Sequence, residues 1–293
     1  MPKLSIGVPV YNAGSTVRRT LERLLSQSET STEIIVSDNA STDGTYAACA
    51  TIAASDSRVR LFRQGRNIGA AMNFQYVLDR ANCDFFMWAA ADDFHSCDFA
   101  AANLAFLCSH PEYGGSISPV QYVGVACPPE VAGDMTIEQD CPADRIAQYV
   151  DRWHRNSIFY GIYRTEVLRR AMWRGAPTMG EDWIVIARIL RHWKLKRIDS
   201  GCLFRSPGGA SYSVHSFSPM TAQPLQNLLP LRVFAETIRS EYSTVEGAQR
   251  SIAASCAKLT ARGLMLWLIL GKRAAIHGCR HALEGARSAI HSE

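Results

Sequence analysis

Several protein classes are excluded by what the sequence lacks. Its nine cysteines are odd in number and no two of them stand in a C-x-x-C pair. This usage argues against a disulfide framework or a zinc site, and it predicts a reduced, cytoplasmic protein. The first residues enter a strand pattern at once, so we expect no signal peptide. The apolar run Leu264 to Leu270 is far shorter than the ~20 residues of a spanning helix.

Neither sign of charge is in large excess. The 31 Lys and Arg against 27 Asp and Glu give a net charge of +4, too little to indicate a nucleic-acid partner. From Arg250 onward there are seven basic and two acidic residues, against 24 and 25 in the rest. With 47% hydrophobic residues and no repeat, the 293-residue chain is neither disordered nor fibrous. Its length predicts a main domain of about 200 residues with an appendage.

In the first third of the chain, short apolar runs alternate with amphipathic or Ala-rich segments. This alternation predicts an α/β fold, in which a mostly parallel sheet is covered by helices on both faces. The strands are expected at 4–10, 33–37, 59–62 and 85–89, and the helices at 15–27, 43–55 and 68–81.

Beyond residue 98 the pattern is looser. Residues 128–140 are expected to form a loop, and Gly and Pro become sparse beyond Pro219, which predicts a helical extension. Helices are expected at 100–108, 144–153, 165–170 and 183–192, and strands at 117–125 (one or two), 157–163 and 196–203.

Three of the predicted strands end in polar clusters, at 9–12, 38–45 and 91–93. In an open parallel sheet, ligands bind beyond the carboxyl ends of the strands. The combination of an amide-rich loop with paired carboxylates suits a nucleotide and its metal. The first strand is not followed by G-x-G-x-x-G, which argues against a dehydrogenase, and no Gly-rich phosphate cradle supports a sugar-nucleotide synthase.

The pair Asp92 and Asp93 directly follows an apolar run. Adjacent carboxylates repel each other, and a hard divalent cation relieves that repulsion. The pair therefore indicates a Mn²⁺ or Mg²⁺ site. The alternative is a solvated turn that caps the following helix.

Two further acidic segments allow both a functional and a structural interpretation. Asp38 could accept hydrogen bonds from a nucleobase or ribose, or its segment could be a simple strand–turn–helix connection. Glu181 and Asp182 open a predicted helix, where carboxylates are stabilised by the helix dipole. One of them could instead be a general base, and Arg188 in the same helix could steady a carboxylate or a phosphate.

Taken together, these motifs resemble the nucleotide-sugar domain of family 2 glycosyltransferases with the GT-A fold. The similar strings are VPVYN, SDNASTDGT, NIGAAMNFQYVLDRA and FFMWAAADDF, followed by GIYRTEVLRR and GEDWIVIARIL. They occur in the family's order and spacing over about residues 3–215. The resemblance does not cover the C-terminal part.

The resemblance implies a role for each matching residue. Asp93 would be the direct metal ligand with Asp92 beside it, and Asp182 would be the catalytic base with Glu181 adjacent and Arg188 in the same helix. The donor nucleotide would be bound by Pro9, Tyr11, Asn12, Asp38 and the segment 67–70, which includes Asn67 and Gly69.

The chain departs from the family pattern at two positions. Many members carry a third acidic residue where this chain has Ala91. The stretch Phe204 to Ser211 lacks the histidine that usually follows the last strand, although His215 is close. Fewer groups would therefore coordinate the metal than in some relatives, or His215 would substitute.

These roles imply an inverting transfer of a sugar from a nucleoside-diphosphate sugar, UDP or dTDP favoured, to an acceptor hydroxyl. The acceptor would be a polysaccharide, a lipid-linked glycan or another glycoconjugate in a bacterial biosynthetic process. The alternative is a catalytically silent protein that binds the nucleotide sugar as a scaffold or partner subunit.

The predicted domains are residues 1–215, which bind the donor and catalyse, and a helical extension over residues 216–293. Within the extension, cations bracket the apolar run Leu264 to Leu270 and recur at Arg280 and Arg287. One interpretation is a helix on the inner face of the plasma membrane. The other is packing on the main domain or, in a homodimer, on a second subunit.

Overall fold

A computed structural model describes residues 3–151, 154–172, 174–175, 180–206, 231–245 and 249–262, without the side chains of 129 and 130. The described residues form two compact units. The first contains 3–151, 154–172, 174 and 182–206, and the second contains 175, 180–181, 231–245 and 249–262. The predicted domain boundary at residue 215 lies outside the described residues and stays a prediction.

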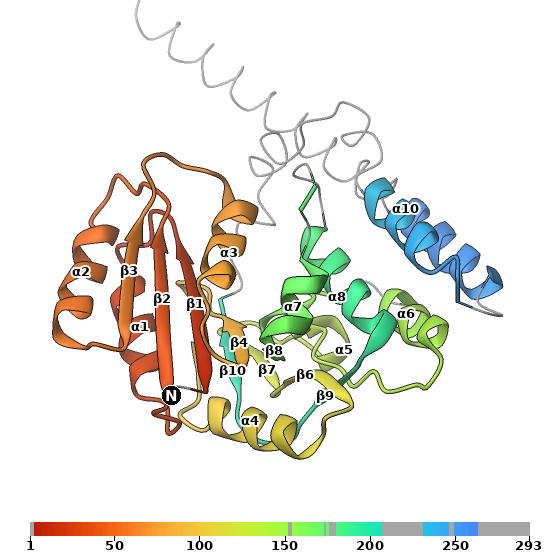
Figure 1. Cartoon of the computed structure of the whole chain (residues 1–293), viewed down its shortest axis with the longest axis horizontal. Helices are drawn as coiled ribbons and strands as arrows, with labels where there is room; N and C mark the ends of the chain where they lie inside the picture. Colours follow the sequence, from red (N-terminus) through yellow and green to blue (C-terminus); the bar gives the residue numbers. More distant parts are fainter. Residues whose placement is uncertain are drawn as a thin grey trace, which may run out of the picture. The chain divides into compact units, whose positions relative to one another are not determined.

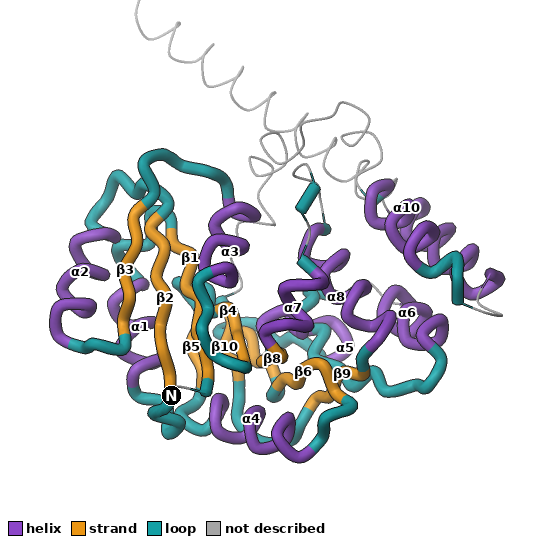
Figure 2. The backbone as a smooth tube through the Cα atoms, in the orientation of Figure 1, coloured by secondary structure: helices purple, strands orange, loops and turns teal. Residues whose placement is uncertain are grey.

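A seven-stranded sheet forms the centre of the first unit, as the ribbon and tube views show (Figure 1, Figure 2). All directly paired strands are parallel except β8, which is antiparallel to both of its neighbours. The predicted mostly parallel α/β sheet is therefore confirmed. In spatial order its strands are β3 (Val59–Arg63), β2 (Thr32–Asp38), β1 (Leu4–Val10), β4 (Phe85–Trp88), β8 (Ile162–Arg164), β6 (Tyr113–Ile117) and β9 (Lys194–Arg197).

Helices connect the parallel strands of the first half. In α1 (Val17–Leu25), the buried residues Val17, Leu21 and Leu24 recur at helical spacing, which gives the helix one apolar face. The next two helices are α2 (Thr45–Ser55), which packs beside α1, and α3 (Ala70–Asp79), which packs on β1 and β2.

Close packing of α3 on the sheet requires a glycine in β1. A Cβ atom at Gly7 would lie 2.6 Å from a methyl group of Val77 and 2.5 Å from the ring of Phe86. Only glycine allows the helix to approach this strand so closely.

A second, three-stranded sheet was not predicted. Here β10 (Leu203–Arg205) pairs antiparallel with β5 (Phe94–His95) and parallel with β7 (Val120–Tyr122). The single strand predicted at 196–203 was therefore wrong, because its residues divide between β9 and β10 in different sheets. The small sheet brings the acidic turn after β4 next to the end of β10.

The remaining elements mostly follow the predicted pattern, with two corrections. Residues 157–160 form the 3-10 turn η1 (Ser157–Tyr160) rather than the start of a strand, and the predicted loop at 128–140 contains α5 (Pro129–Ala132). The other helices are α4 (Phe99–Ser109), α6 (Pro142–Asp151), α7 (Thr165–Ala171) and α8 (Glu181–His192).

An aromatic stack joins β4 to η1. The rings of Trp88 and Phe159 lie 4.5 Å apart and almost parallel, and the Trp88 indole donates a hydrogen bond to the carbonyl of Phe74. Aromatic pairs of this kind add about 0.5–1.5 kcal/mol beyond the burial of their area. The stack holds the end of β4, which leads into Asp92 and Asp93, against the turn that ends at Tyr160.

The second unit contains α10 (Arg232–Glu241) and the helical segment 249–262. The Cys256 thiol donates to the carbonyl of Ala235 at 3.3 Å, which joins the two helices. None of the described helices combines the length and the apolar character that crossing a lipid bilayer requires. The run Leu264 to Leu270, with Arg280 and Arg287 beyond it, lies outside the described residues.

Candidate functional site

The loops that follow β1 and β2 are joined by hydrogen bonds. The backbone N–H of Asn12 donates to the Ser41 hydroxyl at 2.9 Å, and the Asn12 side-chain oxygen accepts from the Thr42 amide at 3.0 Å. Asn12 has a left-handed backbone (φ 49°). Beside it the Tyr11 ring is 49% exposed just after the carboxyl end of β1, and Pro9, the second-last residue of that strand, is half-buried. An exposed aromatic ring at this edge can stack on a nucleobase.

Asp38 ends β2 with its side chain fully buried. Its carboxylate accepts from the Ser41 amide at 3.3 Å and pairs with the Arg63 guanidinium, also at 3.3 Å. The half-exposed Arg63 stacks 4.4 Å above the ring of Tyr46. The structure therefore places Asp38 at the predicted edge, and Arg63, which the sequence analysis missed, is the more exposed member of this ion pair.

The predicted segment 67–70 lies beside the same strand end. The buried Asn39 amide donates to the Asn67 side-chain oxygen at 2.9 Å, and the Asn39 side-chain oxygen accepts from the Ile68 amide at 2.9 Å. Gly69 follows in a left-handed conformation (φ 85°) that favours glycine. These bonds bring Asn67 and Gly69 together with the loop after β2.

The acidic turn after β4 holds its two carboxylates differently. Asp93 is 3% exposed. Its Oδ2 atom lies 3.0 Å from Nε of Arg205, and its Oδ1 atom accepts from the Ser206 amide at 2.9 Å. Burial raises the pKa of Asp93, although the charge of Arg205 opposes that rise. Asp92 is half-buried, so it is the more accessible carboxylate of the pair.

Arg205 is a largely buried cation at the end of β10. Its guanidinium lies 4.3 Å from the centre of the Tyr160 ring and donates to the Ser157 hydroxyl at 3.2 Å. Burial lowers the pKa of Arg205, but Tyr160 and Asp93 raise it by more, so the side chain stays protonated. Its charge compensates the buried carboxylate of Asp93.

Asp182 is the second residue of α8. Its Oδ2 atom accepts from the side-chain amide of Asn156 at 2.9 Å. Burial raises the pKa of Asp182, and the hydrogen bond from Asn156 lowers it. Glu181 is the first residue of α8 and is half-buried.

The carboxylates after β4 and at the start of α8 both raise the pKa of Tyr160. The pKa of Tyr160 is raised to about 12, first by burial and then by the negative charges of Asp93, Asp182 and Asp92, against the effect of Arg205. The turn after β4 and the start of α8 are also joined through the segment 156–160, because Arg205 contacts Asp93, Ser157 and Tyr160, and Asn156 donates to Asp182. Their catalytic roles stay predictions.

The predicted roles of Arg188 and His215 stay predictions. The Arg188 guanidinium donates to the carbonyl of Met172 at 2.9 Å, just beyond α7, which gives it a role in joining two helices. His215, the predicted substitute metal ligand, lies outside the described residues.

Asp92 and Asp93 offer neighbouring carboxylate oxygens to a divalent cation. Among the described residues, no three His, Cys, Asp or Glu side chains are grouped so that they could hold a metal ion. Mg²⁺ is commonly held by one or two carboxylates together with substrate phosphates. Each carboxylate oxygen has two lone pairs, so Asp93 can still accept beside Arg205. Asp92 and Asp93 therefore fit a cation that a diphosphate and water would complete.

Sequence reasoning missed Asn156, Tyr160 and the contacts of Arg205. A signal existed for Arg205, because it stands in the stretch where the family has a basic and aromatic motif. Asn156 gives no comparable local signal, since its partner Asp182 is 26 positions away.

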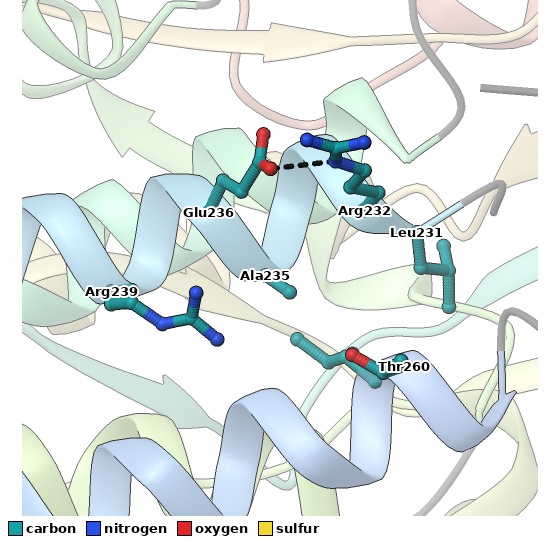
Figure 3. Close-up of a pocket in the computed structure, with 7 residues that line it drawn as sticks. Leu231, Arg232, Ala235, Glu236, Arg239 and Thr260 are labelled. Atoms are coloured by element: carbon teal, nitrogen blue, oxygen red, sulfur yellow. Dashed lines mark hydrogen bonds and ion pairs between the residues drawn. The ribbon is translucent and has the colours of Figure 1, made fainter. Parts of the chain in front are cut away.

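A separate pocket of about 190 Å³ lies within the second unit (Figure 3). Arg232 pairs with Glu236 at its rim at 2.6 Å, and Arg239 points towards it from the same helix. Leu231 and Leu259 are buried at its lining. The pocket has no carboxylate pair comparable to that of the first unit.

Comparisons with known proteins agree with this geometry. The model of the glycosyl transferase family 2 matches residues 5–139. The putative glycosyltransferase EpsE of Bacillus subtilis is 33% identical over 113 residues, which cover 38% of this chain and 41% of that protein. The chain thus matches about two fifths of that relative's length.

Two solved structures share the fold. Staphylococcus aureus TarS 1–349 in complex with UDP-GlcNAc has a TM-score of 0.66 at 17% identity, covering 88% of this chain and 71% of that one. The mannosyltransferase PcManGT of Pyrobaculum calidifontis, in complex with GDP-Man and Mn²⁺, has a TM-score of 0.52 at 18% identity, covering 95% and 81%. Residues 5–139 are thus similar to glycosyl transferase family 2, and the chain shares the GT-A-type fold of these two solved structures.

Proposed function

We propose that this chain is a glycosyltransferase that moves a sugar from a nucleoside-diphosphate sugar to an acceptor hydroxyl, with inversion at the anomeric carbon. The observation that carries the proposal is a series of contacts that links the two acidic positions: Arg205 pairs with Asp93 and donates to Ser157, and Asn156, the residue before Ser157, donates to Asp182. A transferase of this kind needs one group beside the departing diphosphate and another beside the attacking hydroxyl. The carboxyl edge of the sheet supplies both.

The donor nucleoside would lie over the joined loops after β1 and β2. The Tyr11 ring would stack on the base, and Arg63 would donate to base carbonyl oxygens, held in place by Asp38 and Tyr46. The segment 67–69 would close over the ribose. UDP and dTDP are the favoured nucleotides, and the names of the TarS and PcManGT complexes, with UDP-GlcNAc and GDP-Man, support a nucleoside-diphosphate donor.

Asp92 and Asp93 would hold a Mn²⁺ or Mg²⁺ ion against the donor diphosphate. When bound, such an ion neutralises the negative charge that develops on the leaving group. Mn²⁺ appears in the name of the PcManGT complex. Arg205 favours the ionised form of Asp93 and holds it in position, because it places a compensating charge 3.0 Å from that carboxylate.

Asp182 would act as the general base. It takes the proton of the acceptor hydroxyl, whose oxygen attacks the anomeric carbon from the face opposite the diphosphate. The bond from that carbon to the diphosphate oxygen breaks, and the nucleoside diphosphate leaves with the bonding electron pair. Burial raises the pKa of Asp182 and so makes it a stronger base. A base of this kind contributes about 10²–10⁴ in rate.

The test is donor hydrolysis, in which water replaces the acceptor. The full chain is incubated with Mn²⁺ or Mg²⁺ and a panel of UDP-, dTDP- and GDP-sugars. We expect one donor to be hydrolysed, and we expect Asp182→Asn to bind that donor but to lose turnover about 10²–10⁴-fold. Asp199→Asn is the matched control, because Asp199 is an exposed aspartate that pairs with Arg197.

The same panel addresses the catalytically silent alternative. Tight nucleotide binding without hydrolysis of any donor would favour a scaffold protein. Normal turnover in Asp182→Asn would instead remove the role of Asp182 while leaving the similarity to the family intact.

We further propose a cytoplasmic location, in keeping with the eight described cysteines, all of which are free thiols. The acceptor would be a glycan or a lipid-linked glycan, and the basic C-terminal part would either lie on an anionic membrane or pack on the main domain or a second subunit. Co-sedimentation with anionic vesicles, compared with neutral vesicles and with sedimentation velocity of the chain alone, separates these arrangements.

A further inference from the structure

We propose that Asn156 is a positioning residue that fixes the carboxylate of Asp182 for catalysis. The inference rests on the proposed function, since it assigns Asn156 a task only if Asp182 is the base. The two residues are joined by a hydrogen bond of 2.9 Å from the Asn156 amide to Oδ2 of Asp182.

The orientation of the Asn156 side chain is fixed from both ends. Its oxygen accepts from the Tyr149 hydroxyl at 2.6 Å, and its nitrogen faces the carboxylate of Asp182. If the amide were turned around, its oxygen would face the carboxylate oxygen of Asp182, and two acceptors would oppose each other. The amide therefore presents a donor to Asp182.

The backbone of Asn156 is equally constrained. It is left-handed (φ 49°, ψ 39°), a conformation that asparagine tolerates better than most residues. Its N–H donates to Nδ1 of His154 at 3.0 Å, and its side chain is 1% exposed. The left-handed turn aims the side chain at the start of α8.

A tightly packed shell surrounds this turn. Because Nδ1 of His154 accepts, its proton lies on Nε2, which donates to the Tyr149 carbonyl at 3.1 Å. The His154 ring stacks at 4.3 Å on Trp183, the residue after the base. A Cβ atom at Gly133 would lie 2.3 Å from the His154 ring. The shell leaves no room for Asn156 to move away from Asp182.

The same segment also reaches the acidic turn. Ser157 follows Asn156 directly and accepts from Arg205, which pairs with Asp93. One short stretch of chain thus contacts the groups proposed for both halves of the reaction. We infer that it sets the spacing between the base and the carboxylates that face the diphosphate.

A hydrogen bond to the charged form of a carboxylate stabilises that form and limits its rotation. Loss of the bond should therefore raise the pKa of Asp182 above its present value and leave the carboxylate misaligned. The reaction rate should fall while the affinity for the nucleotide stays the same. A merely structural asparagine would change stability without moving the titration of Asp182.

The experiment compares three variants in the full chain. Asn156→Gly keeps the left-handed backbone and removes the amide, and Asn156→Asp keeps the shape but replaces the donor with a second carboxylate. Tyr149→Phe removes the hydroxyl that orients the amide. The matched control is Tyr163→Phe, which removes a buried hydroxyl bonded to the carbonyl of Ile158 in the neighbouring turn.

Two measurements follow. The first is the pH profile of UDP-GlcNAc hydrolysis with Mn²⁺, separated into kcat and KM. The second is the ¹³C titration of the side-chain carboxyls in aspartate-labelled protein, with Asp182→Asn used to assign the Asp182 signal. The titration needs neither turnover nor a metal ion.

We expect Asn156→Gly to lower kcat at least tenfold with KM for the donor within twofold, and Asn156→Asp to raise the Asp182 pKa by about one unit or more. Tyr149→Phe should give a smaller shift and Tyr163→Phe none. Unchanged kcat and an unchanged Asp182 titration in both Asn156 variants would overturn the proposal. A wild-type chain that hydrolyses no donor would count against the proposed function alone, because the ¹³C titration would still test the bond.

Discussion

The Nε atom of Arg205 lies 3.0 Å from Oδ2 of Asp93, although the two residues are 112 positions apart in the chain. Both side chains are largely buried, so each compensates the charge of the other in a region with little water. The pair links two neighbouring strands of the three-stranded sheet, since Arg205 ends β10 and Asp93 precedes β5. It therefore serves the fold as well as the candidate site.

Removal of one partner of this pair should be costly. Arg205→Met would leave Asp93 buried without a compensating charge, which typically costs about 3–5 kcal/mol of unfolding free energy. Denaturation with urea measures the loss, and the Asp93→Asn, Arg205→Met double variant should recover part of it. Arg232→Met removes an exposed pair with Glu236 and should cost less than about 1 kcal/mol. Equal losses in the two arginine variants would contradict this account.

Nucleotide binding should depend on the divalent cation through Asp92. A saturating ligand at 100 times its Kd stabilises a protein by about 2.7 kcal/mol. We expect UDP to stabilise the wild type more in Mn²⁺ than in EDTA, and Asp92→Asn to lose that difference. Thermal shift assays measure it, with Asp98→Asn, six positions further on, as the control. Equal UDP shifts in Mn²⁺ and in EDTA for the wild type would argue against a metal at this turn.

His95 should make the protein sensitive to mild acid. The ring is buried against Phe99, neither ring nitrogen has a hydrogen-bond partner among the described residues, and burial lowers the pKa to about 3 from 6.5. Between those pH values the unfolded chain binds the proton and the folded chain does not. The free energy of unfolding should therefore fall as the pH drops below 6.5, by about 2 kcal/mol at pH 5.

His95→Phe keeps the aromatic contact and should remove this dependence. Urea titrations at pH 7.5 and pH 5 measure the effect. His110→Gln is the control, because it changes a histidine on another element and should leave the loss at pH 5 in place. A wild type that is equally stable at both pH values would refute the expectation.

Glu33 should stabilise the opposite edge of the sheet. Its carboxylate accepts from the Ser5 hydroxyl, the Asn82 amide and Arg60, each at 2.7 Å. Burial raises the pKa of Glu33, but these bonds lower it by more, so the net value lies below 4.5. Because the folded-state pKa is depressed, the stabilisation is present above pH 4.5 and is lost as the pH falls through the folded value.

Glu33→Gln should lower the free energy of unfolding by about 1–3 kcal/mol at pH 7. The loss should be smaller in acid, because protonation of Glu33 then removes the same stabilisation from the wild type. Glu22→Gln, which changes an exposed glutamate 3.9 Å from Arg18, should cost less than about 0.5 kcal/mol. Urea denaturation across this pH range gives both numbers. A loss that does not diminish in acid would show that charge is not its cause.

Much of the first half of the fold could be predicted from the sequence. The strands at β1 and β2 are buried along almost their whole length, and such runs stand out as continuous apolar segments between helical patterns. The polar clusters at their ends were correctly expected at one edge, because parallel neighbours end together. These signals are local, so the sequence reveals them.

The errors have a common cause in contacts between distant segments. Ile158, Phe159 and Tyr160 look like part of a strand, but Phe159 packs on Trp88 instead of pairing along the sheet. The partner of Asp93 is supplied by β10, and the partner of Asp182 lies in a left-handed turn. No pattern within either acidic segment identifies these partners.

The stack of Trp88 on Phe159 has a practical consequence for protein engineering. It joins the strand that leads into the proposed metal ligands to the turn that follows Asn156, which positions the proposed base, so enlarging or trimming either ring would disturb reactivity from within the hydrophobic interior. The loops around Tyr11 and Gly69 are held mainly by polar contacts. Redesign of donor preference is therefore best confined to those loops, with the aromatic support left untouched.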